Sequence, residues 1–219
     1  MSADRKIRLV VLISGRGSNM RSLVEADLPP CRIVVISNRP DAAGLVYARE
    51  RGLATAVVDH REFPTRAEFD AALAAEIDAH RPDVVVLAGF MRILGEPFVN
   101  RFAGRLLNIH PSLLPAFPGV HTHAQALAAG IKIHGCTVHF VTPALDSGPI
   151  VIQAAVPVLR DDDADSLAAR VLAQEHIVYP QALRWFLDGC LTLTEDGRVL
   201  LDGEQPSAAA QALIAPLAK

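Results

Sequence analysis

Short apolar runs alternate with amphipathic stretches along the first half of the chain. Nearly all-apolar segments occupy residues 7–13, 32–37, 54–58, 83–88 and 106–110. Such segments are typical of strands that are buried on both faces of a sheet. Between them, apolar residues at helical spacing predict helices over about 20–26, 42–51, 65–80 and 97–102. This alternation predicts a doubly wound α/β fold with a mostly parallel, Rossmann-like sheet.

The second half of the chain continues the pattern with longer elements. It predicts a helix over 121–129, strands over 135–141 and 149–157, and a long helix that ends near Asp188. A β-hairpin over 191–202 follows, with Asp196 and Gly197 at its turn. We expect one domain over residues 1–219, with a phosphate-binding half at about 7–110, a catalytic half over 111–202 that includes the hairpin, and a weakly ordered tail over 203–219.

The segment 106–110 carries the polar residues that are best placed for chemistry. Asn108 and His110 are two positions apart, so a strand puts both side chains on one face. Pro111 cannot donate to a strand ladder, so the strand ends at His110. Ligands of open parallel sheets collect at the carboxyl ends of the strands. The two later strands form a hairpin whose turn brings Asp146 back to this strand end.

Asn108, His110 and Asp146 form a polar set without an evident nucleophile. The chain has no G-x-S-x-G motif. A carboxamide, an imidazole and a carboxylate suit a reaction in which an amine substrate attacks an acyl group. Asn108 would donate to the oxyanion, and Asp146 would favour a protonated His110 that donates to the tetrahedral intermediate. The alternative is that the strand-end Asn and His act only as caps and turn formers.

A glycine turn follows the first predicted strand. Residues 14–19 read Ser-Gly-Arg-Gly-Ser-Asn, and Ser18 and Asn19 can cap the helix that follows. Backbone N–H groups and the positive end of the helix dipole would converge there on an anion. Met20 stands at the third glycine position of a dinucleotide fingerprint, so a single phosphate fits better than a pyrophosphate. An ordinary strand-to-helix turn stays open as the alternative.

Composition and charge narrow the choice of partners. The net charge is -3, no block of Lys or Arg occurs, and the apolar run at 9–13 is too short for a signal sequence or a membrane span. We therefore expect small-molecule substrates, no nucleic-acid or membrane partner, and a cytoplasmic protein. The oligomeric state is open, a homodimer included.

Cysteine and histidine spacing gives no sign of a metal site. The three cysteines are widely spaced and include no C-x-x-C pair, which argues against a disulfide framework and a structural zinc. His121 and His123 form an H-x-H pair, but a third ligand at the usual spacing is missing. We expect no metal cofactor.

Five linked motifs resemble those of the phosphoribosylglycinamide formyltransferases of purine biosynthesis. The motifs occupy residues 13–19, 87–94, 108–115, 119–123 and 138–149, in order and with unbroken spacing. The resemblance extends from about Arg8 to Asp202. It implies a formyltransferase fold and the transfer of a formyl group from the co-substrate 10-formyltetrahydrofolate to the amine of the ribotide. It assigns Asn108, His110 and Asp146 as the catalytic set.

The resemblance also implies ligand contacts and one backbone isomer. It gives the ribotide phosphate to Gly17, Ser18 and Asn19, and the ribose hydroxyls to Glu175, whereas the residues alone, with Glu175 beside the apolar stripe of its helix, favour a solvated Glu175. Residues 89–94 by themselves leave open a helix start packed on the sheet or the wall of a pocket for a flat ligand. The Leu114–Pro115 bond is implied to be cis. The folate contacts that the resemblance implies are Arg66, Met91, Arg92, Ile93, Leu94 and Asn108, with Thr142, Pro143, Ala144 and Leu145 beside the pterin.

Other functions compete with this reading. Methionyl-tRNA formyltransferase and formyltetrahydrofolate deformylase share the Asn-His-Asp set. The first would call for an extra basic C-terminal domain and the second for an N-terminal regulatory domain. Because this chain begins its first strand at Ile7 and leaves only a hairpin and a tail after Asp188, both are disfavoured. A non-catalytic module that binds a phosphate ligand at residues 15–19 is the alternative from a different class.

Overall fold

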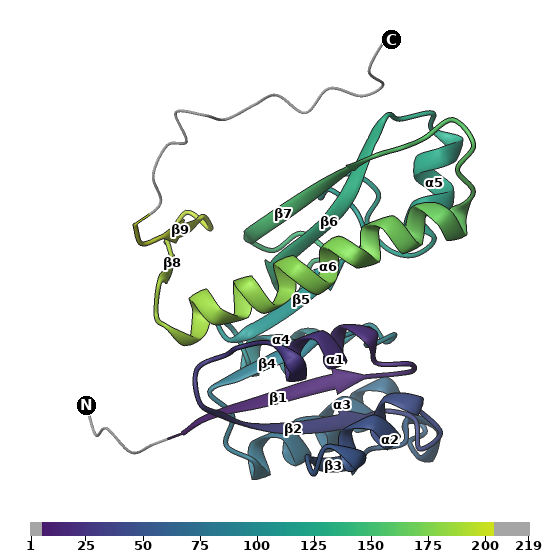
Figure 1. The fold of residues 1–219 in the computed structure, drawn as a ribbon. Helices are drawn as coiled ribbons and strands as arrows, with labels where there is room; N and C mark the ends of the chain where they lie inside the picture. The colour runs from purple at the N-terminus through teal and green to yellow at the C-terminus, as the bar shows by residue number, and fades with distance from the viewer. Residues whose placement is uncertain (1–5, 204–219) are drawn as a thin grey trace.

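A seven-stranded sheet forms the centre of the molecule (Figure 1). The computed structural model describes residues 6–203. The order of the strands across the sheet is β3-β2-β1-β4-β5-β6-β7. The strands are β1 (Ile7–Ile13), β2 (Cys31–Ser37), β3 (Ala54–Val57), β4 (Val84–Leu87), β5 (Leu106–His110), β6 (Ile133–Phe140) and β7 (Ile150–Pro157).

The direction of the strands changes once across the sheet. The first five strands pair in parallel, whereas β6 pairs antiparallel with both β5 and β7. The predicted doubly wound and mostly parallel sheet is therefore confirmed. β5 stands at the change of direction, between the parallel strands and the β6–β7 hairpin. The β6–β7 turn begins after Phe140, which lies opposite Leu107 in the amino-terminal half of β5, and its loop folds back so that Asp146 contacts His110 at the carboxyl end.

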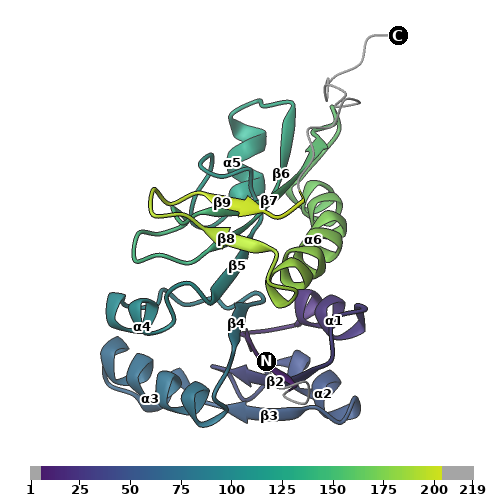
Figure 2. The ribbon, with the colours of Figure 1, turned by 90° about the vertical axis from the view of Figure 1, so that its left-hand side faces the viewer.

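Helices cover both faces of the sheet. Figure 2 shows α3 and α4 on one side of the sheet and α1, α2 and α6 on the other. The same division appears in the two hydrophobic cores, because Phe69 and Phe102 belong to one core and Leu9 and Tyr179 to the other. The helices are α1 (Ser18–Glu25), α2 (Ala43–Glu50), α3 (Arg66–Ala79), α4 (Glu96–Arg101), α5 (Thr122–Ala128) and α6 (Ala164–Leu187), with a short 3-10 turn at His60–Glu62.

Local signals in the sequence fix several helix ends. Thr65 caps α3 in a capping box with Glu68, as expected from a threonine before that helix. Asp163 caps α6 in the same way, with its carboxylate accepting from the Ser166 N–H. The Tyr179 hydroxyl lies 3.1 and 3.2 Å from the carbonyls of Leu87 and Leu107, so it ties α6 to β4 and β5.

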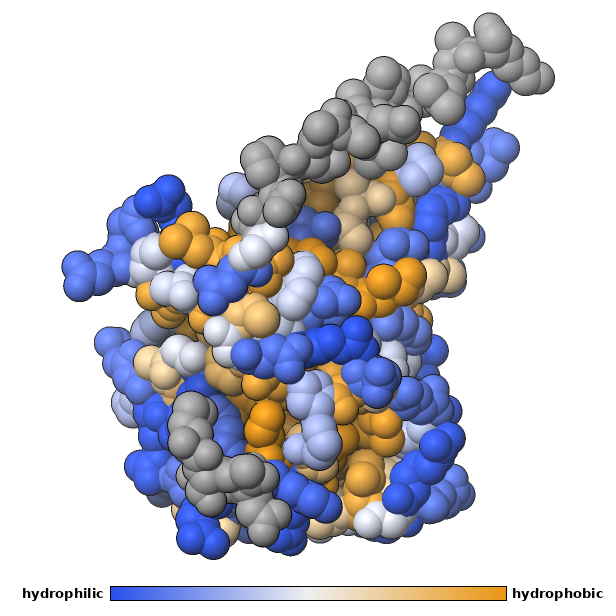
Figure 3. All heavy atoms as spheres, turned by 60° about the vertical axis from the view of Figure 1, so that its left-hand side comes forward, coloured by the Kyte–Doolittle hydropathy of each residue, from blue (hydrophilic) through white to orange (hydrophobic). Residues whose placement is uncertain are grey.

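The remaining predictions about the chain concern its last part and its surface. The hairpin is present as β8 (Leu191–Leu193) and β9 (Val199–Leu201). Residues 204–219 of the expected weakly ordered tail lie outside the described range. On the face seen in Figure 3, polar side chains dominate the margins and apolar ones gather nearer the middle. None of the helices within residues 6–203 is long and apolar enough to span a membrane.

Candidate active site

Asn108 and His110 lie at the carboxyl end of β5, as the strand period predicted. His110 is only 4% exposed, and Asn108 is half-buried. The strand ends there because Pro111 follows, and the chain then turns through Pro115, whose bond to Leu114 is cis, as the resemblance implied. β5 is the strand along which the parallel part of the sheet pairs with the β6–β7 hairpin.

The structure brings His110 and Asp146 together. The His110 Nδ1 lies 3.5 Å from the Asp146 Oδ2, and the His110 Nε2 lies 3.0 Å from the carbonyl oxygen of Phe117. Each ring nitrogen therefore faces an oxygen that can accept a hydrogen bond. These two partners fix the plane and the direction of the imidazole.

Asp146 is held in an unusual backbone conformation. Its φ is 46°, in the left-handed region that Asp tolerates better than most residues. The Gly119 N–H donates to the Asp146 Oδ2 at 2.8 Å, which anchors the carboxylate from the opposite loop. A side chain at Gly148 would meet the Phe140 carbonyl oxygen at 1.8 Å. Glycine at that position lets the hairpin close tightly enough to deliver Asp146 to β5.

His139 is a fourth residue of this cluster, and the sequence reasoning missed its part in it. It stands directly opposite Asn108 in the β5–β6 register. Its Nδ1 donates to the Phe140 carbonyl at 2.9 Å, so its Nε2 can accept from the Asn108 amide nitrogen at 3.2 Å. Burial lowers the pKa of His139, which agrees with a neutral ring in this role. The hairpin register was the signal that could have identified it.

The glycine turn leads directly into α1. Gly17 has a φ of 72° and is the N-cap, and no side chain caps the helix. The expectation that Ser18 and Asn19 cap it was wrong, because the helix begins at Ser18 itself. A side chain at Gly17 would lie 3.0 Å from the backbone of Gly44 in α2, so the close approach of the turn to this helix needs glycine.

Asn19 and Glu175 are far apart in the sequence but form a buried hydrogen-bonded pair. The Asn19 Nδ2 donates to the Glu175 Oε2 at 2.7 Å, while the Asn19 Oδ1 is buried without a partner in the described part of the chain. Glu175 is 6% exposed, and burial raises its pKa. The expectation of a solvated Glu175 is wrong, because its face of α6 packs against α1 and the sheet.

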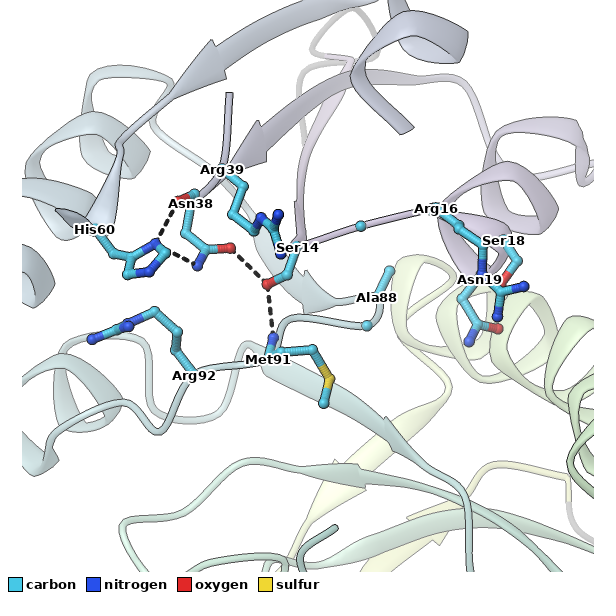
Figure 4. A pocket seen from close by; sticks show the side chains of 13 residues that line it. Ser14, Arg16, Ser18, Asn19, Asn38, Arg39, His60, Ala88, Met91 and Arg92 are labelled. Carbon is cyan, nitrogen blue, oxygen red and sulfur yellow. Dashed lines mark hydrogen bonds between the residues drawn. The ribbon is translucent and has the colours of Figure 1, made fainter. Parts of the chain in front are cut away.

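A cavity of about 510 Å³ opens beside the glycine turn. Figure 4 shows Ser18 and Asn19 at one end of it and His60 and Arg92 at the other. The Ser14 hydroxyl accepts from the Met91 N–H at 2.8 Å and donates to the Asn38 Oδ1 at 2.6 Å. The lining residues are Ser14, Gly15, Arg16, Gly17, Ser18, Asn19, Asn38, Arg39, His60, Ala88, Gly89, Met91 and Arg92.

The residues that the resemblance gives to the folate are spread over several surfaces. Met91 and Arg92 line the cavity, Ile93 is 62% exposed, and Leu94 packs against the core under α3 and α4. The segment 89–94 is therefore a loop, and the helix α4 begins only at Glu96.

The other expected folate residues lie outside that cavity. Arg66 lines a separate cavity of about 490 Å³ between α3 and α4. Thr142, Pro143, Ala144 and Leu145 form the loop that precedes Asp146, where Leu145 is 54% exposed.

The H-x-H pair is split by the fold. His121 is the N-cap of α5, whereas the His123 ring packs edge-on against His134 at 5.3 Å. Within residues 6–203, no group of three or more His, Cys, Asp or Glu side chains could hold a metal ion. Cys31, Cys136 and Cys190 are free thiols.

Comparisons of the sequence and of the structure with known proteins indicate the same family. Residues 7–183 match the family described as Formyl transferase. The chain is 49% identical to the phosphoribosylglycinamide formyltransferase of Escherichia coli strain K12 over 91% of this chain and 95% of that protein. The crystal structure of glycinamide ribonucleotide transformylase 1 from Symbiobacterium toebii superposes with a TM-score of 0.86 at 46% identity, covering 92% of this chain and 100% of that one.

A more distant structure tests the competing reading. A formyltetrahydrofolate deformylase from Pseudomonas syringae shares the fold with a TM-score of 0.83, at 27% identity. The match covers 91% of this chain and 67% of that one. The identity to the two formyltransferases above is higher, at 49% and 46%, over a similar share of the chain. The chain is an enzyme of the Formyl transferase family and belongs among its phosphoribosylglycinamide formyltransferases.

Proposed function

We propose that the enzyme transfers the formyl group of 10-formyltetrahydrofolate to the amine of 5-phosphoribosylglycinamide, with Asn108, His110 and Asp146 as the catalytic set. The observation that carries the proposal is the 3.5 Å contact between the His110 Nδ1 and the Asp146 Oδ2 at the end of β5. An imidazole and a carboxylate beside a carboxamide, without a nucleophile, suit a substrate that supplies its own attacking nitrogen.

The reaction requires one bond to form, one to break and one proton to move. The ribotide amine attacks the formyl carbon, and the carbonyl electrons move onto oxygen. Asn108 donates a hydrogen bond to this oxyanion, a contribution of ~3 to 4 kcal/mol in comparable sites. The intermediate then collapses, the bond from carbon to the folate nitrogen breaks, and the proton lost by the amine ends on that nitrogen. His110, or a water held by Asp146, carries the proton.

The ribotide is assigned to the glycine-turn end of the cavity. Backbone N–H groups of Gly17, Ser18 and Asn19 at the start of α1 suit a phosphate, because no side chain caps that helix. Glu175 is assigned to the ribose hydroxyls. The unpartnered Asn19 Oδ1 beside it supports a ligand that donates a hydrogen bond there.

The folate is assigned to the loop after β4 and to the loop before Asp146. For a flat ligand with a carboxylate-bearing tail, Met91 and Ile93 supply exposed apolar surface and Arg92 supplies one guanidinium, with the half-buried Leu94 beside them. Arg66 supplies a second cation near the tail. The pterin is assigned to Thr142, Pro143, Ala144 and Leu145, and the formyl group lies toward Asn108.

The test of the catalytic assignment is the variant His110→Ala. We expect near-total loss of formyl transfer with ribotide binding retained, because the ring contacts Asp146 and Phe117 rather than the glycine turn. Turnover is followed as tetrahydrofolate release, and ribotide affinity is measured by calorimetry. Unaltered turnover would defeat the assignment.

The substrate assignment has its own test in the same assay. Tetrahydrofolate release by the parent enzyme is compared with the ribotide present and omitted. We expect release only when the ribotide is present. Release at the same rate without it would indicate a deformylase.

A further inference from the structure

The cavity in Figure 4 is larger than one phosphate requires, and its two ends differ in chemistry. The end at Ser18 and Asn19 is assigned above to the ribotide. The opposite end is formed by Arg39, His60 and Arg92. Of these three residues, only Arg92 has a part in the proposed function. Arg39 and His60 therefore have no role in the proposed function.

The charge of the cavity is positive. Its lining includes three arginines and one histidine but no carboxylate. Arg39 donates to Asp41 at 3.1 and 2.7 Å, yet Asp41 is exposed and does not line the cavity. The Arg92 guanidinium lies 5.1 Å from the centre of the Phe69 ring, and its Nε is buried without a partner in the described part of the chain.

A hydrogen-bonded framework holds this end in place. Asn38 is 2% exposed, and its Oδ1 accepts from the Ser14 hydroxyl. The His60 Nδ1 lies 2.8 Å from the Asn38 carbonyl, to which it donates. The Nε2 of that ring then has no hydrogen bond to any residue in the range 6–203. Figure 4 shows His60 and Arg92 at the same end of the cavity, opposite Ser18 and Asn19.

We propose that Arg39, His60 and Arg92 form a subsite for a second oxyanion, a carboxylate or a phosphate, separate from the phosphate of the ribotide. Arginine forks and an imidazole around a cavity without acidic lining are the donors that such a group requires. The proposal rests on the proposed function, because the same cavity borders the loop assigned to the folate. The oxyanion comes either from glutamyl carboxylates added to the folate tail or from free phosphate.

The variant Arg39→Gln tests the subsite, and Arg61→Gln is its matched control. Both arginines are exposed and pair with an aspartate two positions away, Asp41 and Asp59 respectively. Only Arg39 lines the cavity. Arg39→Lys keeps the charge and is expected to retain much of the effect. Thermal midpoints establish that all three variants fold.

Two measurements distinguish the sources of the oxyanion, both with saturating ribotide so that the glycine turn is occupied. The first compares KM for 10-formyltetrahydrofolate carrying one and three glutamates. The second measures inhibition by inorganic phosphate against the folate. If the tail is the source, KM for the triglutamate is about tenfold lower in the parent and in Arg61→Gln, the size of one charge-assisted hydrogen bond, and Arg39→Gln loses this advantage.

If free phosphate is the source, glutamate number has no effect. Phosphate then competes with the folate in the parent and in Arg61→Gln but about tenfold more weakly in Arg39→Gln. The proposal is overturned if Arg39→Gln matches the parent in both measurements. Absence of turnover with the monoglutamate would instead defeat the proposed function. In that case calorimetric titration of phosphate into parent and Arg39→Gln still decides whether the subsite exists.

Discussion

Glu175 is a carboxylate placed where its charge costs stability. Burial raises its pKa, so the folded state holds the proton more tightly than the unfolded chain does. A group of this kind stabilises the fold below its unfolded pKa and loses that contribution as the pH rises through its folded pKa. At neutral pH, Glu175 is therefore retained at a cost, which supports the proposal that it binds the ribotide.

We predict that Glu175→Gln raises the stability of the fold but weakens ribotide binding. The neutral amide can still accept from Asn19, so the variant should be more stable at pH 7.5 by about 1 kcal/mol, with a smaller difference at pH 4. KM for the ribotide should rise by about tenfold or more through loss of the charged acceptor. Thermal unfolding and steady-state kinetics check this, with Glu50→Gln on the exposed end of α2 as control. A less stable variant with unchanged KM would contradict it.

His139 offers a second test at the level of single residues. His139→Phe keeps a ring in the strand but removes the nitrogen that accepts from the Asn108 amide. We expect kcat to fall by about tenfold or more, with little change in KM for either substrate, because Asn108 loses its orientation. In combination with Asn108→Ala, the two losses should be strongly non-additive. Additive losses would show that His139 acts independently of Asn108.

At the scale of elements, hydrogen bonds to backbone groups fix both ends of the loop between β4 and α4. The Ser14 N–H donates to the Gly89 carbonyl at 3.2 Å, and the Ser14 hydroxyl accepts from the Met91 N–H. At the other end, the Gly95 N–H donates to the Asp70 Oδ2 at 2.7 Å. The side chain of Met91 is 71% exposed, so the loop is held from β1 and α3 while its side chains stay free.

We predict that Asp70→Ala weakens folate binding without affecting the ribotide. Removal of the acceptor leaves the Gly95 N–H unpaired and loosens one end of the loop. KM for the folate should rise about fivefold to tenfold, the effect of one lost hydrogen bond, at constant ribotide KM. Asp78→Ala is the control, because Asp78 lies on the same helix but pairs with Arg101. Equal effects of the two substitutions would argue against a role for Asp70 in the loop.

Much of the element pattern was readable in the sequence, because apolar runs and caps act locally. Thr65 and the strand over 106–110 are examples, and Asp146 followed from the hairpin. The start of α1 was not readable, since Gly17 takes its conformation where it meets Gly44 of α2. A contact between distant segments leaves no trace in local spacing.

Some residues of the candidate site could likewise be predicted from the sequence, whereas others could not. Glu175 lies on the same helical stripe as Val171 and Val178, so its burial could have been inferred from spacing. Its partner Asn19 could not, since only the packing of α1 on α6 joins them. Arg39 and His60 follow β2 and β3, and they become site residues only once the strand order is known.

At the scale of the whole molecule, buried histidines link stability to pH. His134 packs between Phe117 and His123, and burial lowers its pKa to about 4. Burial also lowers the pKa of His123 and His139. An unfolded chain binds protons at these positions near pH 6.5, whereas the folded protein does not. Stability from these groups is therefore present above about pH 6.5 and is lost as the pH falls toward 4.

We predict that the enzyme loses stability between pH 7 and pH 5, by up to about 1.4 kcal/mol per pH unit for each such histidine. His134→Phe should reduce this slope, because one of the groups no longer titrates. Urea unfolding of the parent and the variant at several pH values checks the prediction. Identical slopes would mean that His134 takes up its proton equally well in the folded state.

The hydrogen bond between Asn19 and Glu175 joins two positions that are 156 residues apart in the sequence. A ribosome releases the glycine turn early and the carboxylate late. During most of synthesis, the turn therefore exists without the carboxylate that pairs with Asn19. Ribotide that binds through Glu175 can stabilise the folded state only after α6 has left the ribosome. The concentration of this metabolite therefore affects the stability of completed chains and not the folding of chains still being synthesised.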